Sequence, residues 1–108
     1  MNIKDAMGFL GICRKAGRLA CGHDAVVETL RNSQCRLVML ASDASARLVR
    51  EMEFECSRDG RSIEVLKTAC SMEDFAAGIG RRSAVYSVTD DGFANKLKQK
   101  FGEELDGN

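Results

Sequence analysis

The chain has 108 residues, of which 44 % are hydrophobic and 30 % are charged, a composition typical of one globular domain. No apolar run approaches the roughly 20 residues of a transmembrane helix, and Gly8 and Gly11 interrupt the apolar patch near the amino terminus. We therefore expect a cytoplasmic protein with no membrane span and no signal peptide. Five cysteines without a CxxC pair, together with a single histidine, match neither a disulfide framework nor a zinc site, so no metal or cofactor is expected.

The zero net charge conceals an uneven distribution. Residues 1–50 hold eight Lys or Arg against four Asp or Glu, whereas residues 51–108 hold eight against twelve. The acidic excess includes Glu51, Glu53 and Glu55, which we interpret as a solvated helix face. The basic half is suited to a polyanionic partner.

The first half of the chain predicts two helices and two strands. The apolar residues that follow the helical period in the first helix are Met7, Leu10 and Cys13, and Gly17 would cap that helix at its end. A short strand over residues 19–21 leads into a second helix that begins at Gly22. The buried stripe of the second helix comprises Val26, Val27 and Leu30. Residues 37–41, LVMLA, predict a strand that is buried on both faces.

The second half continues the alternation of helix and strand. Asp43 is the predicted cap of a third helix, which a turn at Asp59-Gly60 ends, and a third strand covers residues 63–66. Ser71 and Asp74 resemble a capping box that opens a fourth helix. The remaining predicted elements are a strand at 84–88 and a last helix, capped by Thr89 or Asp90, that carries Phe93, Leu97 and Phe101.

Short connections between these elements predict an α/β fold in a single domain over residues 1–108. Helices on both faces of the sheet give a three-layer α/β/α sandwich around a four-stranded mixed sheet.

The helix that begins at Gly22 is a candidate anion-binding element. Its first backbone N–H groups have no partner within the helix, and Arg14, Lys15 and Arg18 precede it closely in the sequence. Cys21 and His23 could form a nucleophile and a base, but no residue is recognisable as their orienting partner. The thiols are better interpreted as small apolar groups.

Three sequence blocks together resemble a known family. GICRKAGRLACGHDAV, RLVMLASDAS and FAAGIGRRSAVYSVTDDGFANKL are similar in order and spacing to the bacterial YlxQ-type proteins of the kink-turn RNA-binding superfamily named after ribosomal protein L-seven-Ae. The resemblance covers roughly Gly8 to Leu97. It implies a compact α/β/α fold that holds sharply bent RNA between the start of the second helix and the loop before the last strand. On this chain those elements are Gly22-His23-Asp24 and Ile79-Gly80-Arg81-Arg82-Ser83.

The chain departs from the strong RNA binders of this superfamily at the helix start. Where they carry Thr-Asn-Glu and, one turn later, lysine, this chain has His23, Asp24, Ala25 and Glu28. Arg18 keeps the basic position after the Gly17 turn, and the second loop is more cationic than the mainly apolar loop of the family. The resemblance therefore implies RNA binding with a weaker or different site preference. His23 could stack on a base or donate to a phosphate, or it could simply be an exposed helix-start residue.

The sequence thus favours a non-enzymatic, monomeric protein that binds structured, kink-turn-like RNA in a ribosome- or translation-associated role, with ribosomal RNA as one candidate partner. An alternative is a protein-interaction module that uses the same fold without RNA, which the neutral net charge and the altered helix start favour. An enzyme is disfavoured because no nucleophile, base and orienting group are found together. The candidate RNA-binding residues are Arg14, Lys15, Arg18, Gly22, His23, Asp24, Arg31, Ile79, Gly80, Arg81, Arg82 and Ser83.

Overall fold

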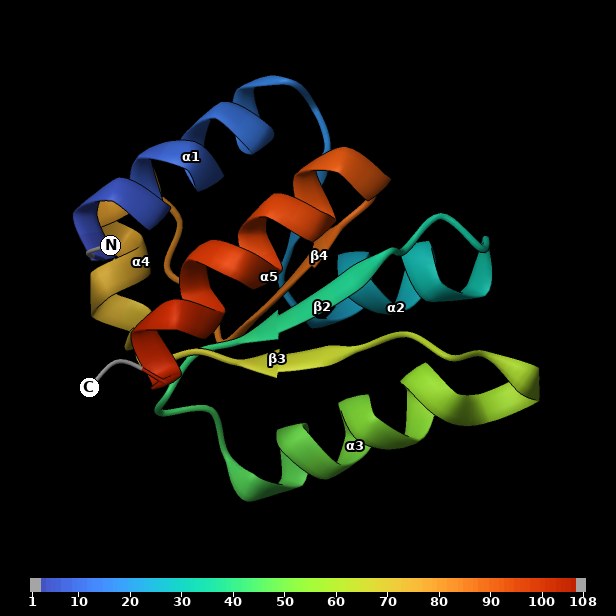
Figure 1. Cartoon of the computed structure of the whole chain (residues 1–108). Helices are drawn as coiled ribbons and strands as arrows, with labels where there is room; N and C mark the ends of the chain where they lie inside the picture. The colour runs from blue at the N-terminus through green and yellow to red at the C-terminus, as the bar shows by residue number, and fades with distance from the viewer. Residues whose placement is uncertain (1–2, 107–108) are drawn as a thin grey trace.

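The computed structural model of the chain describes residues 3–106, with side chains as far as residue 102. Within that range helices and strands alternate as the sequence predicts (Figure 1). The elements are α1 (Ile3–Lys15), β1 (Leu19–Cys21), α2 (His23–Arg31), β2 (Leu37–Leu40), α3 (Ala46–Ser57), the short 3-10 helix η1 (Arg58–Gly60), β3 (Val65–Lys67), α4 (Met72–Ile79), β4 (Val85–Val88) and α5 (Asp91–Asp106).

The sheet has the strand order β1-β4-β2-β3 and is mixed, as predicted. β4 pairs antiparallel with both β1 and β2, and β2 pairs parallel with β3. In the β1–β4 register, Leu19 faces Val88 and Cys21 faces Tyr86. The carboxyl end of β1, where α2 begins, therefore lies beside the amino end of β4.

Two apolar clusters cover the two faces of the sheet. One cluster packs α1, α4 and α5 against side chains such as Met39 and Tyr86, and the other packs α2 and α3 against Val38 and Leu40 (Figure 1). Successive residues of β2 alternate between the clusters because side chains along a strand point to opposite faces. This arrangement is the predicted three-layer α/β/α sandwich.

Most predicted helix ends are confirmed. Ser71 and Asp74 form the capping box of α4, and the Asp90 carboxylate accepts a hydrogen bond from Phe93 N at 2.9 Å at the start of α5. Gly17 follows α1 with a φ of +75°, as expected for a left-handed cap, and Asp59 turns the chain after α3 with a φ of +56°.

The predicted cap of α3 is wrong. Ser45 caps this helix, since its hydroxyl accepts a hydrogen bond from Leu48 N at 3.1 Å. Asp43 instead accepts from Met72 N at 3.0 Å and thereby ties the loop before α3 to the first turn of α4. Both residue types are good caps, and the sequence does not show that another helix end competes for the carboxylate.

Three strands are shorter than predicted: β2 ends at Leu40, β4 begins at Val85 and β3 begins at Val65. Before β3, Ile63 N donates to Cys56 O at 3.1 Å, so this residue is held by the end of α3 and not by the sheet.

The thiols lie in or beside the core. All five cysteines are free; four are buried and Cys21 is half-buried. Burial raises the pKa of Cys13 to about 11 and that of Cys56 to about 12, so both thiols stay protonated near neutral pH. In the part of the chain that the structure describes, no helix is both long and apolar enough to cross a bilayer.

The close approach of α1 and α4 generates a stability prediction. A Cβ at Gly78 would lie 2.8 Å from Met7 Cγ, whereas one at Gly8 would meet no heavy atom within 4 Å. Because alanine is favoured over glycine by about 1 kcal/mol inside a helix, we expect Gly8→Ala to raise the free energy of unfolding. We expect Gly78→Ala to lower it, because Met7 is buried and must move. Urea unfolding followed by circular dichroism measures both, and equal stabilisation by the two substitutions would contradict the close packing.

Candidate nucleic-acid interface

The β1–β4 pairing brings together the two segments that the sequence predicts to bind RNA. Gly22 N, at the start of α2, donates to Val85 O at 2.9 Å. A Cβ on Gly22 would lie 4.0 Å from the Ser83 hydroxyl oxygen, so the loop before β4 passes within van der Waals distance of the helix start. Segments about 60 residues apart in the sequence thus form one surface.

The backbone at Gly22 requires glycine. Its φ of 95° and ψ of 161° lie in a region that side chains other than hydrogen essentially exclude. No side chain caps α2, so the N–H groups of its first turn have no side-chain acceptor among the described residues. The start of α2 is therefore open to an external acceptor such as a phosphate oxygen.

The hydroxyl of Tyr86 fixes the loop that faces Gly22. It donates to Arg81 O and accepts from Ser83 N, both at 2.9 Å, and its ring packs on Phe75 with centroids 4.5 Å apart. Burial is the main cause that raises the pKa of Tyr86, so the phenol keeps the proton that it donates. The loop backbone is thus held from the core.

Arg14 holds the same loop from the side of α1. Its Nη1 donates to Ile79 O at 2.8 Å, at the point where Gly80, with a φ of 75°, ends α4. The Ile79 side chain is buried in the core. Only the backbone of Ile79 can therefore take part in the predicted interface.

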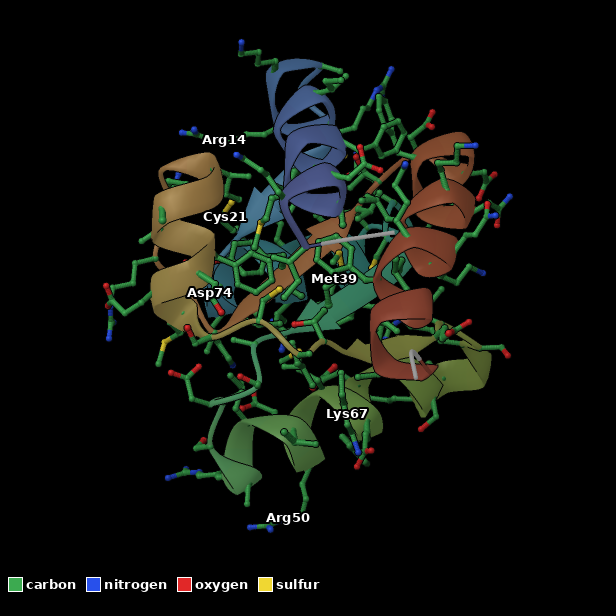
Figure 2. All side chains as sticks on the ribbon, turned by 60° about the vertical axis from the view of Figure 1, so that its left-hand side comes forward. Arg14, Cys21, Met39, Arg50, Lys67 and Asp74 are labelled. Carbon is green, nitrogen blue, oxygen red and sulfur yellow. The ribbon has the colours of Figure 1, made fainter. Side chains whose placement is uncertain are left out.

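The cations of the interface differ in availability. Arg81 is exposed, and its side chain makes no hydrogen bond or ion pair with the described residues, whereas the Arg82 guanidinium pairs with Glu73. Burial raises the pKa of Cys21, and the positive charges of Arg81 and Arg14 oppose that rise. Figure 2 labels Arg14 and Cys21. The positive charge of the interface thus gathers around the end of β1.

His23 is held between two carboxylates. Its Nδ1 lies 2.9 Å from an Asp24 oxygen, and its Nε2 lies 2.5 Å from an oxygen of Glu51 on α3. Hydrogen bonds to Asp24 and then to Glu51 raise the pKa of His23 and so favour the imidazolium form. The ring links α2 to α3, and the carboxylates weaken the pull of the helix start on phosphate.

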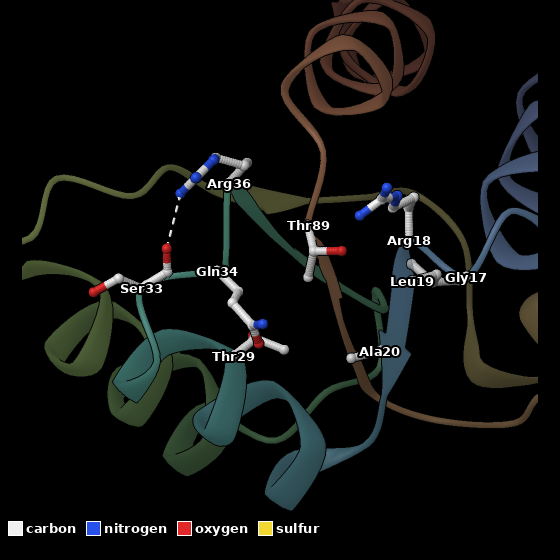
Figure 3. Close-up of a pocket in the computed structure, with 9 residues that line it drawn as sticks. All are labelled: Gly17, Arg18, Leu19, Ala20, Thr29, Ser33, Gln34, Arg36 and Thr89. Atoms are coloured by element: carbon white, nitrogen blue, oxygen red, sulfur yellow. Dashed lines mark hydrogen bonds between the residues drawn. The ribbon is translucent and has the colours of Figure 1, made fainter.

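One predicted residue, Arg18, lies away from this surface. Arg18 precedes β1 at its opposite end, roughly 13 Å of extended chain from Gly22. There it lines a pocket of about 370 Å³ with Arg36 and Thr89 (Figure 3). Arg31, on the last turn of α2, lines a pocket together with His23 and Asp24. Lys15 lines a groove between α1 and α4 together with Arg14 and Ile79, so both residues lie beside the interface. Nearness in sequence does not make Arg18 a neighbour of the helix start.

The sequence prediction omits two residues that shape the interface, Tyr86 and Glu51. A tyrosine within an otherwise buried strand is a signal, because its hydroxyl needs a hydrogen-bond partner. Glu51 gives no such signal, since its contact with His23 joins separate helices.

Several known proteins are similar to the chain in sequence. A model of the ribosomal protein L7Ae/L30e/S12e/Gadd45 family matches residues 4–98. The RNA-binding protein YlxQ of Bacillus subtilis (strain 168) is 30 % identical over 90 residues, covering 82 % of this chain and 87 % of its own. The RNA-binding protein YlxQ of Enterococcus faecium is 27 % identical over 99 residues, covering 91 % of this chain and 92 % of its own.

Solved structures share the fold. A Bacillus halodurans protein of unknown function superposes with a TM-score of 0.82 at 28 % identity, covering 91 % of this chain and 97 % of its own. The Giardia lamblia 15.5kD RNA binding protein superposes with a TM-score of 0.69 at 15 % identity, covering 90 % of this chain and 82 % of its own. Since the family model spans most of the sequence and the YlxQ proteins align along more than four fifths of it, the chain belongs to the ribosomal protein L7Ae/L30e/S12e/Gadd45 family as a YlxQ-type member.

Proposed function

We propose that this protein binds structured, kink-turn-like RNA as a monomer, without catalysing a reaction on it, in a cytoplasmic process linked to the ribosome or translation. The observation that carries the proposal is the contact between the start of α2 at Gly22 and the loop that ends at Ser83. Two relatives that align along most of the chain are named RNA-binding proteins, which supports the same class of ligand. Ribosomal RNA is one candidate partner.

The chemistry of the surface suits a bent RNA better than a straight duplex. The open N–H groups of α2 and the Arg81 guanidinium can meet phosphates, while the Asp24 carboxylate can accept from a base edge. A sharp bend exposes base edges and brings two backbones together, so one small surface can contact both. Specificity then depends on RNA shape.

The helix start provides the first test. We expect the combined substitution Asp24→Asn, Ala25→Glu and Glu28→Lys to tighten binding to a kink-turn RNA and to leave binding to a straight duplex of equal length nearly unchanged. The added lysine and the loss of the Asp24 charge remove repulsion from phosphate, and the new carboxylate can accept from a base. Isothermal titration calorimetry at one salt concentration measures both affinities.

Glu64→Lys is the matched control, because it makes the same net charge change just before β3, at the far edge of the sheet. We expect this control to change the affinities for kink-turn RNA and for the straight duplex only slightly, and by the same factor. Tightening of both RNAs by the triple substitution, or of neither, would mean that the start of α2 does not face the bend.

The loop provides the second test. Tyr86→Phe keeps the ring that packs on Phe75 but removes the two hydrogen bonds to the loop backbone, each worth about 1 kcal/mol net. We expect kink-turn RNA to bind several-fold more weakly because the loop is no longer held against the core. Fluorescence anisotropy of labelled RNA measures the change.

Ser87→Ala controls for lost stability. It removes a buried hydroxyl on the same strand, one that forms a hydrogen bond with Thr29 on α2 at 2.8 Å. This variant should melt at a lower temperature but bind RNA like the wild type. If the two variants lost RNA affinity in proportion to their loss of stability, Tyr86 would have no positioning role at the interface.

A further inference from the structure

The outward face of α3 carries an exposed aromatic ring among arginines. We call this the α3 face and define it as Arg47, Arg50 and Phe54, which lie three and four residues apart on α3 and so share one side of the helix, together with Arg58, which follows the helix at the start of η1. The Phe54 side chain is 62 % exposed, more than any other large hydrophobic residue among those described. A single exposed ring is ordinary on a protein surface, so its meaning depends on the charged groups around it.

The acidic residues of α3 are neutralised by partners. Glu51 contacts His23, Glu53 pairs with Lys67 at 3.2 Å, and Glu55 is buried between two arginines. The sequence analysis interprets these three residues as a solvated acidic face, and for Glu55 the structure contradicts that interpretation.

Two of the three basic residues of the α3 face stay available, whereas Arg58 pairs with Glu55 at 3.6 Å and with Asp59 at 3.5 Å. Arg47 and Arg50 are exposed, and their side chains form no ion pair or hydrogen bond with the residues that the structure describes. In Figure 2 the labelled Arg50 points from α3 away from the sheet into solvent. The α3 face therefore carries uncompensated positive charge, although the sequence around it is rich in acids.

The Arg58 side chain lies over the ring of Phe54. The Arg58 guanidinium carbon lies 6.0 Å from the centroid of the Phe54 ring, within the range of a cation–π contact. Aromatic rings set in a basic surface are the means by which proteins bind single-stranded nucleic acid, because bases stack on the ring while cations pair with the phosphates.

The α3 face adjoins the candidate RNA interface. Glu51, which contacts His23 at the start of α2, lies one helical turn before Phe54. A chain of nucleotides that leaves the start of α2 thus reaches the ring after a short distance along the surface.

We propose that the α3 face binds a single-stranded segment that flanks the bent RNA, with a base stacked on Phe54 and phosphates paired with Arg47 and Arg50. This inference rests on the proposed function, because the bent RNA delivers the single strand to α3. It adds a second contact that recognises unpaired nucleotides.

The test compares kink-turn RNA with blunt ends against the same RNA carrying six unpaired uridines at the 5′ or the 3′ end of one strand. We expect one of the two extensions to tighten binding to the full chain several-fold. Phe54→Ala should remove that gain, a loss of about five- to tenfold on the extended RNA, and leave the affinity for blunt RNA unchanged. Ile12→Ala is the matched control, because Ile12 is the other exposed large hydrophobic residue in the described range, at 56 %, and lies on α1.

The outcomes separate this inference from the proposed function. If blunt kink-turn RNA binds but neither extension adds affinity, the α3 face proposal is overturned and the proposed function stands. If blunt RNA does not bind at all, the proposed function is overturned and the inference falls with it. If Phe54→Ala changes self-association in analytical ultracentrifugation and leaves all RNA affinities unchanged, the face binds a second copy of the chain and the proposal is overturned. Because Phe54 is exposed, its substitution should not change the melting temperature, which circular dichroism checks.

Discussion

The candidate interface depends on the antiparallel pairing of β1 with β4. Gly22 and Ser83 are about 60 residues apart in the sequence, and this pairing places them beside each other. Both faces of the sheet are covered by helices, so the register cannot slip easily. A shift of β4 by one residue would move the Tyr86 side chain to the other face of the sheet. Its hydroxyl would then lose its hydrogen bonds with the backbone of the loop. The same packing that stabilises the core thus sets the position of the loop.

The net charge of zero does not describe the surface, because charges of each sign gather in different places. Arginine side chains gather at the end of β1 and on α3, while carboxylates surround His23 between them. A surface of mixed sign attracts a polyanion weakly at long range, because the fields of opposite charges cancel at a distance. Dissolved salt also screens exposed charges beyond about 10 Å at 0.1 M ionic strength. Binding to RNA therefore has to come from close contacts that match a particular shape, such as open helix N–H groups and a loop held in place.

The sequence predicts the fold well because the fold follows from local pattern. Helical and strand periods give the elements, and the Ser71 capping box and the Gly17 turn are complete within a few residues. Where a group has partners from distant segments, the prediction is incomplete: Asp43 serves α4 and not α3, and Glu51 binds a histidine 28 positions away. Arg18 shows the same limit for the site. It is close to Gly22 along the chain, but an intervening strand places it at the other end of the sheet edge. The structure brings together the helix start and the loop. The hydrogen bonds by which Tyr86 and Arg14 hold the loop join residues that are brought together only in the folded chain, so the sequence alone does not reveal them.

The central claim is that RNA meets the start of α2 and the loop before β4 at the same time. A titration of the 15N-labelled full chain with kink-turn RNA, followed by amide NMR shifts, tests it directly. The account predicts that the amides of residues 22–24 and 80–83 shift first and together, while those of β3 stay in place. Shifts confined to one of the two segments, or largest around the pocket of Arg18 and Arg36, would contradict it.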